Sequence, residues 1–172
     1  AQLGRLALLS LAGTSVNDLR PLEQLYGLRY LDLGRTEVTD ASLRSIADLR
    51  NLHTLSLKQT AITDLSPIAG LAQLTHLVLE GVPAARFYAL PSLVLLNVND
   101  TSFADADLDA LPTTLTALHL RQTKVTKPEA IARFARLRTL DVSHLPVTRE
   151  HTLAWRPLGL RVLNASYTRL SR

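Results

Sequence analysis

The stretch LRYLDLGRTEV at residues 28–38 contains the frame L-x-x-L-x-L, and this frame returns along the whole chain. It begins at Leu6, Leu28, Leu52, Leu74, Leu93, Leu115 and Leu137, with a weakened copy, L-x-x-L-x-A, at Leu160. The intervals between successive starts are 22, 24, 22, 19, 22, 22 and 23 residues. Self-similarity at this period indicates an array of small units, which we number as repeats 1 to 8.

Each repeat has the pattern of a short strand followed by a return segment. In the L-x-L part the apolar residues alternate, as a strand with one buried face requires, and the spacers have room for a turn and one or two helical turns. One such unit cannot bury its own leucines, so neighbouring units must stack and pair their strands in parallel, about 4.8 Å apart. The pattern therefore predicts one α/β solenoid domain over residues 1–172, with about eight repeats.

These repeats resemble the leucine-rich repeat family, L-x-x-L-x-L-x-x-N/C-x-L, over essentially the whole chain. The stretch TDLSPIAGL at residues 63–71 looks like the return segment of internalin-type repeats, and the short spacing fits the short-repeat classes. The resemblance implies a curved, right-handed solenoid, with a parallel sheet on the concave face and short helices or 3-10 turns on the convex face.

Where the family usually has asparagine or cysteine, this chain has threonine in six repeats. A buried hydroxyl needs a partner, and the backbone groups freed by the turn after the strand are the obvious ones. We therefore expect a structural ladder of threonines, whereas Val82 and Leu145 at the same position should mark irregular repeats. The ladder consists of Thr14, Thr36, Thr60, Thr101, Thr123 and Thr168.

The return segments begin with residues typical of helix starts. Asp18, Asp40 and Asp64 could accept from free backbone amides at helix N-termini, and Thr126 with Glu129 has the spacing of a capping box. The return segment of repeat 4 is the shortest, and its aromatic residues, at positions 87 and 88, are expected to fill the space left by missing leucines.

The concave sheet is the predicted functional surface, because side chains between the leucines must point away from the ladder. Mixed charge with scattered aromatic groups is typical of protein interfaces, whereas a small-molecule site calls for a closed apolar pocket. The predicted partner-binding residues are Tyr30, Asp32, Arg35, Lys58, His76, Asn97, His119, Arg121, Asp141, His144 and Tyr167.

Catalytic and metal sites are not favoured by this arrangement. His119 and Asp141 are neighbours in one column of the predicted sheet, but the nearest serine in that column, Ser56, is three strands from His119, roughly 14 Å away. His76 and His119 are two strands apart in different columns, and no third ligand converges on them. We therefore predict no enzymatic activity, no metal and no cofactor.

Composition and charge narrow the range of partners. A net charge of +4 comes without an evident cluster of basic residues and aromatics, so specific nucleic-acid binding is not predicted. No apolar run is long enough to span a membrane. The absence of cysteine and of a visible signal peptide favours an intracellular protein, although a secreted or surface location stays open.

The sequence thus predicts a protein-protein interaction module whose partner is another protein. One alternative is the substrate-recognition part of a larger machine, such as a ubiquitin-ligase adaptor or a bacterial effector, and a more remote one is a GTPase-activating leucine-rich repeat protein. Neither end shows a cap, so we also expect either a longer parent protein or end-to-end self-association.

Overall fold

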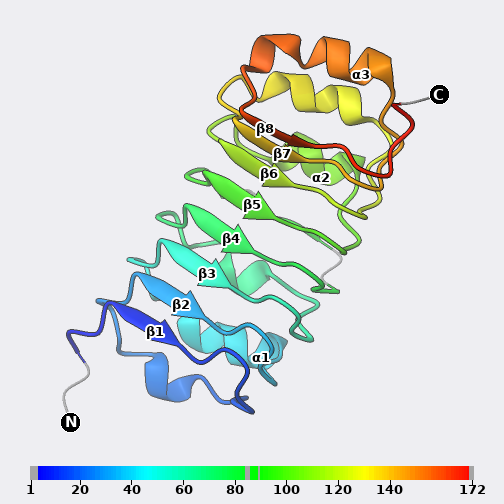
Figure 1. Ribbon diagram of the computed structural model, residues 1–172. Coiled ribbons are helices and arrows are strands. Elements are labelled where there is room, and N and C mark those ends of the chain that lie inside the picture. Colours follow the sequence, from blue (N-terminus) through cyan, green and yellow to red (C-terminus); the bar gives the residue numbers. More distant parts are fainter. Residues whose placement is uncertain (1–3, 84–85, 89, 171–172) are drawn as a thin grey trace.

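A computed structural model describes residues 4–83, 86–88 and 90–170. Its strands form one parallel sheet in the order β1-β2-β3-β4-β5-β6-β7-β8, with each repeat adding one strand (Figure 1). This is the predicted solenoid architecture. The strands are β1 Leu8–Ser10, β2 Tyr30–Asp32, β3 Thr54–Ser56, β4 His76–Val78, β5 Leu95–Asn97, β6 Ala117–His119, β7 Thr139–Asp141 and β8 Val162–Asn164.

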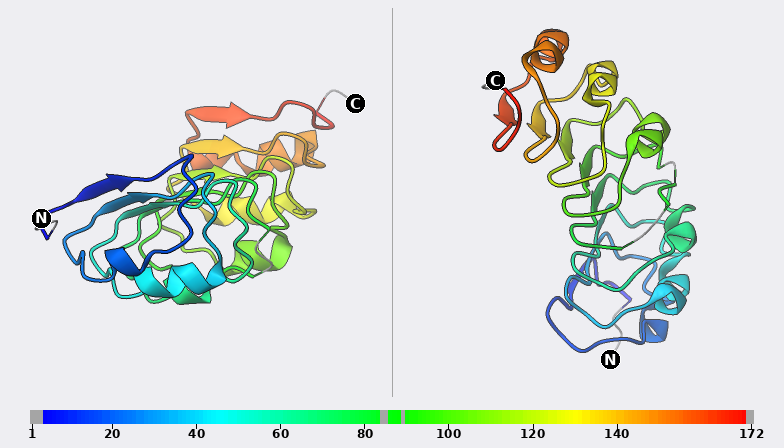
Figure 2. Two further views of the ribbon diagram at one scale, coloured as in Figure 1. Left: turned by 90° about the horizontal axis from the view of Figure 1, so that it is seen from below. Right: turned by 90° about the vertical axis from the view of Figure 1, so that its right-hand side faces the viewer.

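Short helices occupy the return segments, and they follow the outer side of the curve while the strands line the inner side (Figure 2). Between β4 and β5, where the interval is shortest, the described residues contain no helix. The α-helices are α1 Asp40–Leu43, α2 Asp105–Ala110 and α3 Arg149–Ala154, and the 3-10 helices are η1 Arg20–Leu22, η2 Arg44–Ile46, η3 Ser66–Ile68, η4 Pro128–Arg133 and η5 Arg156–Leu158. None of the helices in the described residues has the length and apolar character needed to cross a bilayer.

The strands pair in the register that the repeat frame predicts. Leu8 lies opposite Tyr30, and the same frame position is matched in each of the following pairings. Even the short fourth interval leaves the register unchanged, because His76 still lies opposite Leu95. The deletion in repeat 4 is therefore absorbed by the return segment and not by the sheet.

The frame leucines form one continuous core along the array. Leu28, Leu31 and Leu33 in repeat 2 are fully buried, and their equivalents in repeats 3 to 7 are at most 2% exposed. Burying a leucine side chain contributes about 1.5–3 kcal/mol, so this ladder is the main source of stability. At the two edge strands the ladder opens: Leu9 in β1 is half-buried, and Leu163 in β8 is exposed.

The fourth return segment is filled by aromatic side chains, as expected. Phe87 and Tyr88 are half-buried and pack on the core. Phe87 also meets Phe103 of repeat 5 edge to face, with ring centroids 4.7 Å apart. This contact bridges the boundary where the return segment lacks a helix.

Two of the three aspartates expected at helix starts lie where the sequence predicts. Asp18 accepts from the Arg20 amide at 3.0 Å, and Asp64 accepts from the Ser66 amide at 2.8 Å, each at the start of a 3-10 helix. The Arg20 side chain also hydrogen-bonds to Asp18 and lowers the pKa of that carboxyl to about 2.

The prediction for Asp40 is wrong, because its carboxylate does not cap its own helix. It accepts from the Thr63 and Asp64 amides of the next repeat, at 2.7 and 3.0 Å. Burial raises the pKa of Asp40, but the hydrogen bonds from Thr63 and Asp64 outweigh burial, and the net pKa is lowered. The carboxylate therefore links the return segments of repeats 2 and 3.

The predicted capping box of Thr126 and Glu129 is also wrong, for the same reason. The Thr126 amide and hydroxyl donate to Asp105 of the preceding repeat, at 2.9 and 2.6 Å. Asp105 occupies the same position in repeat 5 as Asp40 does in repeat 2. One position of the repeat thus links adjacent return segments at two points of the array.

Candidate functional site: the concave sheet

The eleven predicted partner-binding residues share the concave surface but extend along its length. Six of them lie in strands and five in the turns that follow a strand. The first, Tyr30, is in β2, and the last, Tyr167, follows β8, so about six strand spacings, or roughly 29 Å, separate them. The structure thus forms an extended face and not a single convergent site.

The eighth residue of every repeat has a left-handed backbone, which the sequence analysis missed. The φ values lie between 53° and 72°, and only Gly13 and Gly81 are glycines among the eight. A left-handed conformation costs other residues about 1–2 kcal/mol. The presence of glycine at this position in two repeats was the sign in the sequence that the backbone there could be left-handed. The six non-glycine members are Arg35, Gln59, Asp100, Gln122, His144 and Tyr167.

Near the N-terminal end of the face, polar side chains pair across adjacent repeats. The Arg35 Nε donates to the Gln59 side-chain oxygen at 2.8 Å, and Lys58 Nζ lies 2.9 Å from a Glu80 carboxylate oxygen. The Asp32 carboxylate accepts from the Gly34 amide at 2.9 Å and thereby fixes the turn after β2. Most of the charge in this part of the face is therefore balanced locally.

The C-terminal end of the face holds a second cluster, around Asp141. Its carboxylate accepts from the Ser143 amide and hydroxyl at 2.9 and 2.7 Å, and from the Asn164 side chain at 3.1 Å. Beside it the rings of His144 and Tyr167 stack with centroids 4.6 Å apart. A hollow of about 410 Å³ lies here, lined by Arg121, Ser143, His144, Asn164, Ser166 and Tyr167.

The described residues of this face do not bring the candidate catalytic and metal-binding side chains together. His119 lies opposite Asp141 in the sheet, but no hydrogen bond joins the two side chains in the part of the chain that the structure describes. Ser56 is three strand pairings from His119. Among the described residues no group of three His, Asp or Glu side chains could hold a metal ion.

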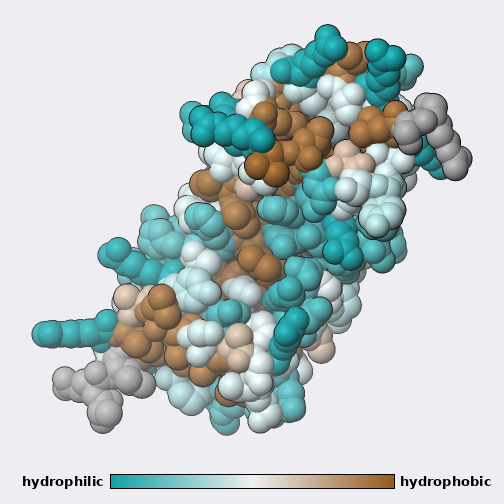
Figure 3. All heavy atoms as spheres, in the orientation of Figure 1, coloured by the Kyte–Doolittle hydropathy of each residue, from teal (hydrophilic) through white to brown (hydrophobic). Residues whose placement is uncertain are grey.

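The middle of the concave sheet mixes apolar and polar side chains. Val78, Leu95 and Ala117 lie half-buried on β4, β5 and β6, and each strand also carries one polar side chain, from His76, Asn97 or His119. Figure 3 shows apolar patches that run along the length of the array, with polar side chains on both sides. Apolar side chains set among polar ones are usual in protein-protein interfaces.

The threonines of the predicted ladder each donate a hydrogen bond to the carbonyl three residues earlier. The oxygen-oxygen distances are between 2.6 and 2.8 Å. The bond therefore closes the turn within one repeat and does not join neighbouring repeats. Thr36, Thr60 and Thr101 are buried, Thr123 and Thr168 are half-buried, and Thr14 is exposed.

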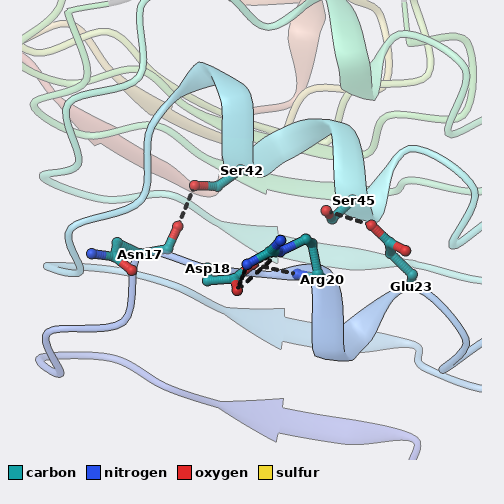
Figure 4. Close-up of polar contacts among 6 residues, drawn as sticks. All are labelled: Asn17, Asp18, Arg20, Glu23, Ser42 and Ser45. Atoms are coloured by element: carbon teal, nitrogen blue, oxygen red, sulfur yellow. Dashed lines mark hydrogen bonds and ion pairs between the residues drawn. The ribbon is translucent and has the colours of Figure 1, made fainter.

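A hollow on the convex side, between repeats 1 and 2, is lined by polar groups that bond to one another (Figure 4). Asp18 pairs with Arg20, Ser45 donates to Glu23 at 2.8 Å, and the Ser42 hydroxyl donates to the Asn17 carbonyl. The two serine bonds connect the first two return segments. The hollow is therefore a junction between repeats.

Comparison with known proteins agrees with this geometry. Residues 26–83 match the family model described as leucine rich repeat. The chain has the leucine-rich repeat fold. No curated protein sequence matches it.

Three solved leucine-rich repeat structures illustrate the similarity. An internalin from Listeria monocytogenes has a TM-score of 0.76 at 22% identity, over 100% of this chain and 58% of its own length. Internalin C2 from the same species has a TM-score of 0.72 at 24% identity, over 93% of this chain and 80% of its own length. The ectodomain of the Arabidopsis thaliana receptor kinase GASSHO1/SCHENGEN3, in complex with CASPARIAN STRIP INTEGRITY FACTOR 2, has a TM-score of 0.70 at 18% identity, over 96% of this chain and 22% of its own length.

Proposed function

We propose that this leucine-rich repeat array is a protein-binding module that uses its concave face and performs no catalysis. The observation that carries the proposal is the mixed surface of that face, in which Val78, Leu95 and Ala117 lie among polar side chains and a polar cluster lies toward each end. The complex formed by the plant receptor ectodomain supports the same use of the fold. The partner is expected to be a protein surface, because the hollows along this face are open and shallow and lack the enclosure that small molecules need.

Affinity purification followed by mass spectrometry would identify a partner, and variants of the full chain would then locate its contact. We expect Leu95→Glu to weaken binding at least about tenfold, because it places a charge in the middle of the face, and Tyr30→Ala to weaken it as well, because tyrosine is enriched among the residues that dominate interface energetics. Arg44→Ala, on the convex side, should change affinity less than about twofold. Losses from the convex variant equal to those from the concave variants would refute the proposal.

Arg133 is unsuitable as a convex control, although it lies on the convex side. Its guanidinium donates to the carbonyls of Leu108, Asp109 and Leu111, at 3.0, 3.1 and 2.6 Å. Replacing it would remove hydrogen bonds from the end of α2 and would disturb the array itself. Arg44 has no side-chain hydrogen bond or ion pair to any described residue and is the better choice.

We also propose that the edge strands can pair with another chain. Val162 and Leu163 in β8 and Leu8 in β1 are exposed, and both strands have one unpaired edge among the described residues. Such edges favour the addition of a further strand. Light scattering over a concentration series should show association of the isolated 172-residue chain, and a constant monomer mass would contradict this proposal.

A further inference from the structure

Charge is distributed very unevenly along the array. Residues 114–172 contain eleven Lys and Arg but only three Asp and Glu, whereas residues 1–113 contain eight Lys and Arg and twelve Asp and Glu. The formal charge is therefore +8 over the last third of the chain and −4 over the rest, although the total is only +4. A local excess of one sign attracts partners of the other sign and raises their association rate.

Part of this excess borders the concave strands of repeats 6 to 8. Arg138 and Arg161 come one residue before β7 and β8, and Arg121 follows β6 by two residues. The side chains of Arg121 and Arg161 make no hydrogen bond or ion pair with any described residue. Arg138 is held in place by its bonds to the Leu137 and Leu158 carbonyls, at 2.8 and 2.7 Å.

The acidic residue of this surface is already occupied. Both carboxylate oxygens of Asp141 accept hydrogen bonds, from Ser143 and from Asn164. Asp141 keeps its negative charge, because both donors are neutral, but among the described residues it makes no ion pair with Arg121 or Arg161. In repeats 2 to 5 the same face has as many acidic as basic side chains, and Lys58 is paired with Glu80.

The arginines lie near the two edges of the strands, and the Asp141 carboxylate lies between these edges, at the end of β7. Arg138 and Arg161 occupy the second position of their repeats and Arg121 the seventh, so five residues of extended chain, about 16 Å, separate the two edges. Val162, which is 55% exposed, lies between the edges, and the stacked pair of His144 and Tyr167 lies one position beyond that of Arg121. Cations at both edges, with an exposed aliphatic group between them and an aromatic pair beside one edge, suit a segment with acidic ends and apolar residues between.

We propose that the concave surface of repeats 6 to 8 is the docking site for an acidic, extended segment of a protein partner. Carboxylates about five residues apart would meet Arg161 on one side and Arg121 on the other, a hydrophobic side chain between them would lie against Val162, and an aromatic side chain would lie against Tyr167 beside Arg121. This proposal rests on the proposed function of the concave face. Beyond that function, it specifies which repeats of the concave face bind the partner and what chemistry the bound segment has.

A fluorescence anisotropy titration of the full 172-residue chain at low salt would test this docking site. The probe is a labelled peptide with two glutamates at each end and Ala-Val-Tyr between them, and its counterpart has lysines in place of the glutamates. A labelled single-stranded DNA oligonucleotide of equal negative charge is the third probe. We expect the glutamate peptide to bind at least about tenfold more tightly than either of the other two.

Two double variants with the same charge change separate a local site from overall attraction. Arg121→Gln with Arg161→Gln should weaken binding of the glutamate peptide about tenfold, whereas Arg29→Gln with Arg44→Gln, both in repeat 2, should weaken it less than about twofold. Circular dichroism melts would verify that all variants are folded. Equal losses from the two variants, or binding of DNA as tight as that of the peptide, would overturn the proposal.

The outcome is also separable from that of the proposed function. If a purified protein partner loses affinity with Leu95→Glu but not with the Arg121 and Arg161 variant, the concave face binds proteins and the acidic docking site is wrong. If neither variant affects the partner and Arg44→Ala does, both proposals are wrong.

Discussion

Replacing Thr60 with valine isolates the contribution of one turn hydroxyl, because the two side chains have nearly the same shape. The Thr60 hydroxyl donates to the Leu57 carbonyl at 2.7 Å, and Thr60 is only 5% exposed, so water cannot easily take its place. The same carbonyl also accepts from the Thr60 amide at 3.2 Å and would keep that bond in the variant. The carbonyl therefore loses one of two partners, and the expected cost is about 1 kcal/mol.

For a chain of this size, a loss of about 1 kcal/mol lowers the melting temperature by roughly 2–4 °C. Urea unfolding and thermal melting followed by circular dichroism would measure it. Thr14→Val is the matched control, because the Thr14 hydroxyl makes the same bond, to the Leu11 carbonyl at 2.6 Å, but is exposed to water. We expect the control to lose less than about 0.5 kcal/mol. Equal stability of Thr60→Val and the parent, or equal losses in the two variants, would show that the buried hydroxyl does not stabilise the turn.

Three further changes test other contacts of the array. Because the pKa of Asp40 is lowered, its ionised form stabilises the fold at pH values above the ordinary carboxyl range, and this contribution is lost as the pH falls through the lowered pKa. In urea unfolding, Asp40→Asn should therefore lower the free energy of unfolding at pH 7 and change it little at pH 2. Asp48→Asn, at an exposed surface ion pair, should cost little at either pH. Gln122→Gly should raise the free energy of unfolding, by up to about 1 kcal/mol, because glycine tolerates the φ of 54° there; a loss of stability would contradict the strain argument. Arg133→Lys should lower the melting temperature, since a compact ammonium cannot reproduce the planar fork in which two guanidinium nitrogens reach three carbonyls, while Arg136→Lys should leave it unchanged.

The sheet and its register could be predicted from the sequence, because both follow from one rule that is repeated in every unit. The leucine positions determine which side chains are buried, and burial in turn fixes which ones line the concave columns, as the pairing of Tyr30 with Thr54 shows. The role of Asp40 could not be predicted in this way. A carboxylate at a helix start can bond within its own helix or to the next repeat, and only the stacking distance between repeats decides between the two.

The candidate site was predictable in composition but not in conformation. The sequence places Arg35, His144 and Tyr167 beside the concave strands, yet it does not reveal that all three have left-handed backbones. Most residue types avoid that conformation, so side-chain identity gave no sign of it apart from two glycines. The charge imbalance was visible in the sequence, but it becomes meaningful only once Arg121 and Arg161 are seen to be unpaired on one face.

The unbroken register of the sheet has a consequence for how such a surface can change. Because the shortened fourth repeat leaves His76 opposite Leu95, residues can be gained or lost on the outer side without displacing any concave side chain relative to its neighbours. Conversely, duplicating or removing a whole repeat would shift everything beyond it by one strand spacing, about 4.8 Å, and keep each column intact. On the concave face, single side chains can therefore be exchanged and whole repeats inserted without moving the other side chains out of their columns, while the leucine core beneath stays the same.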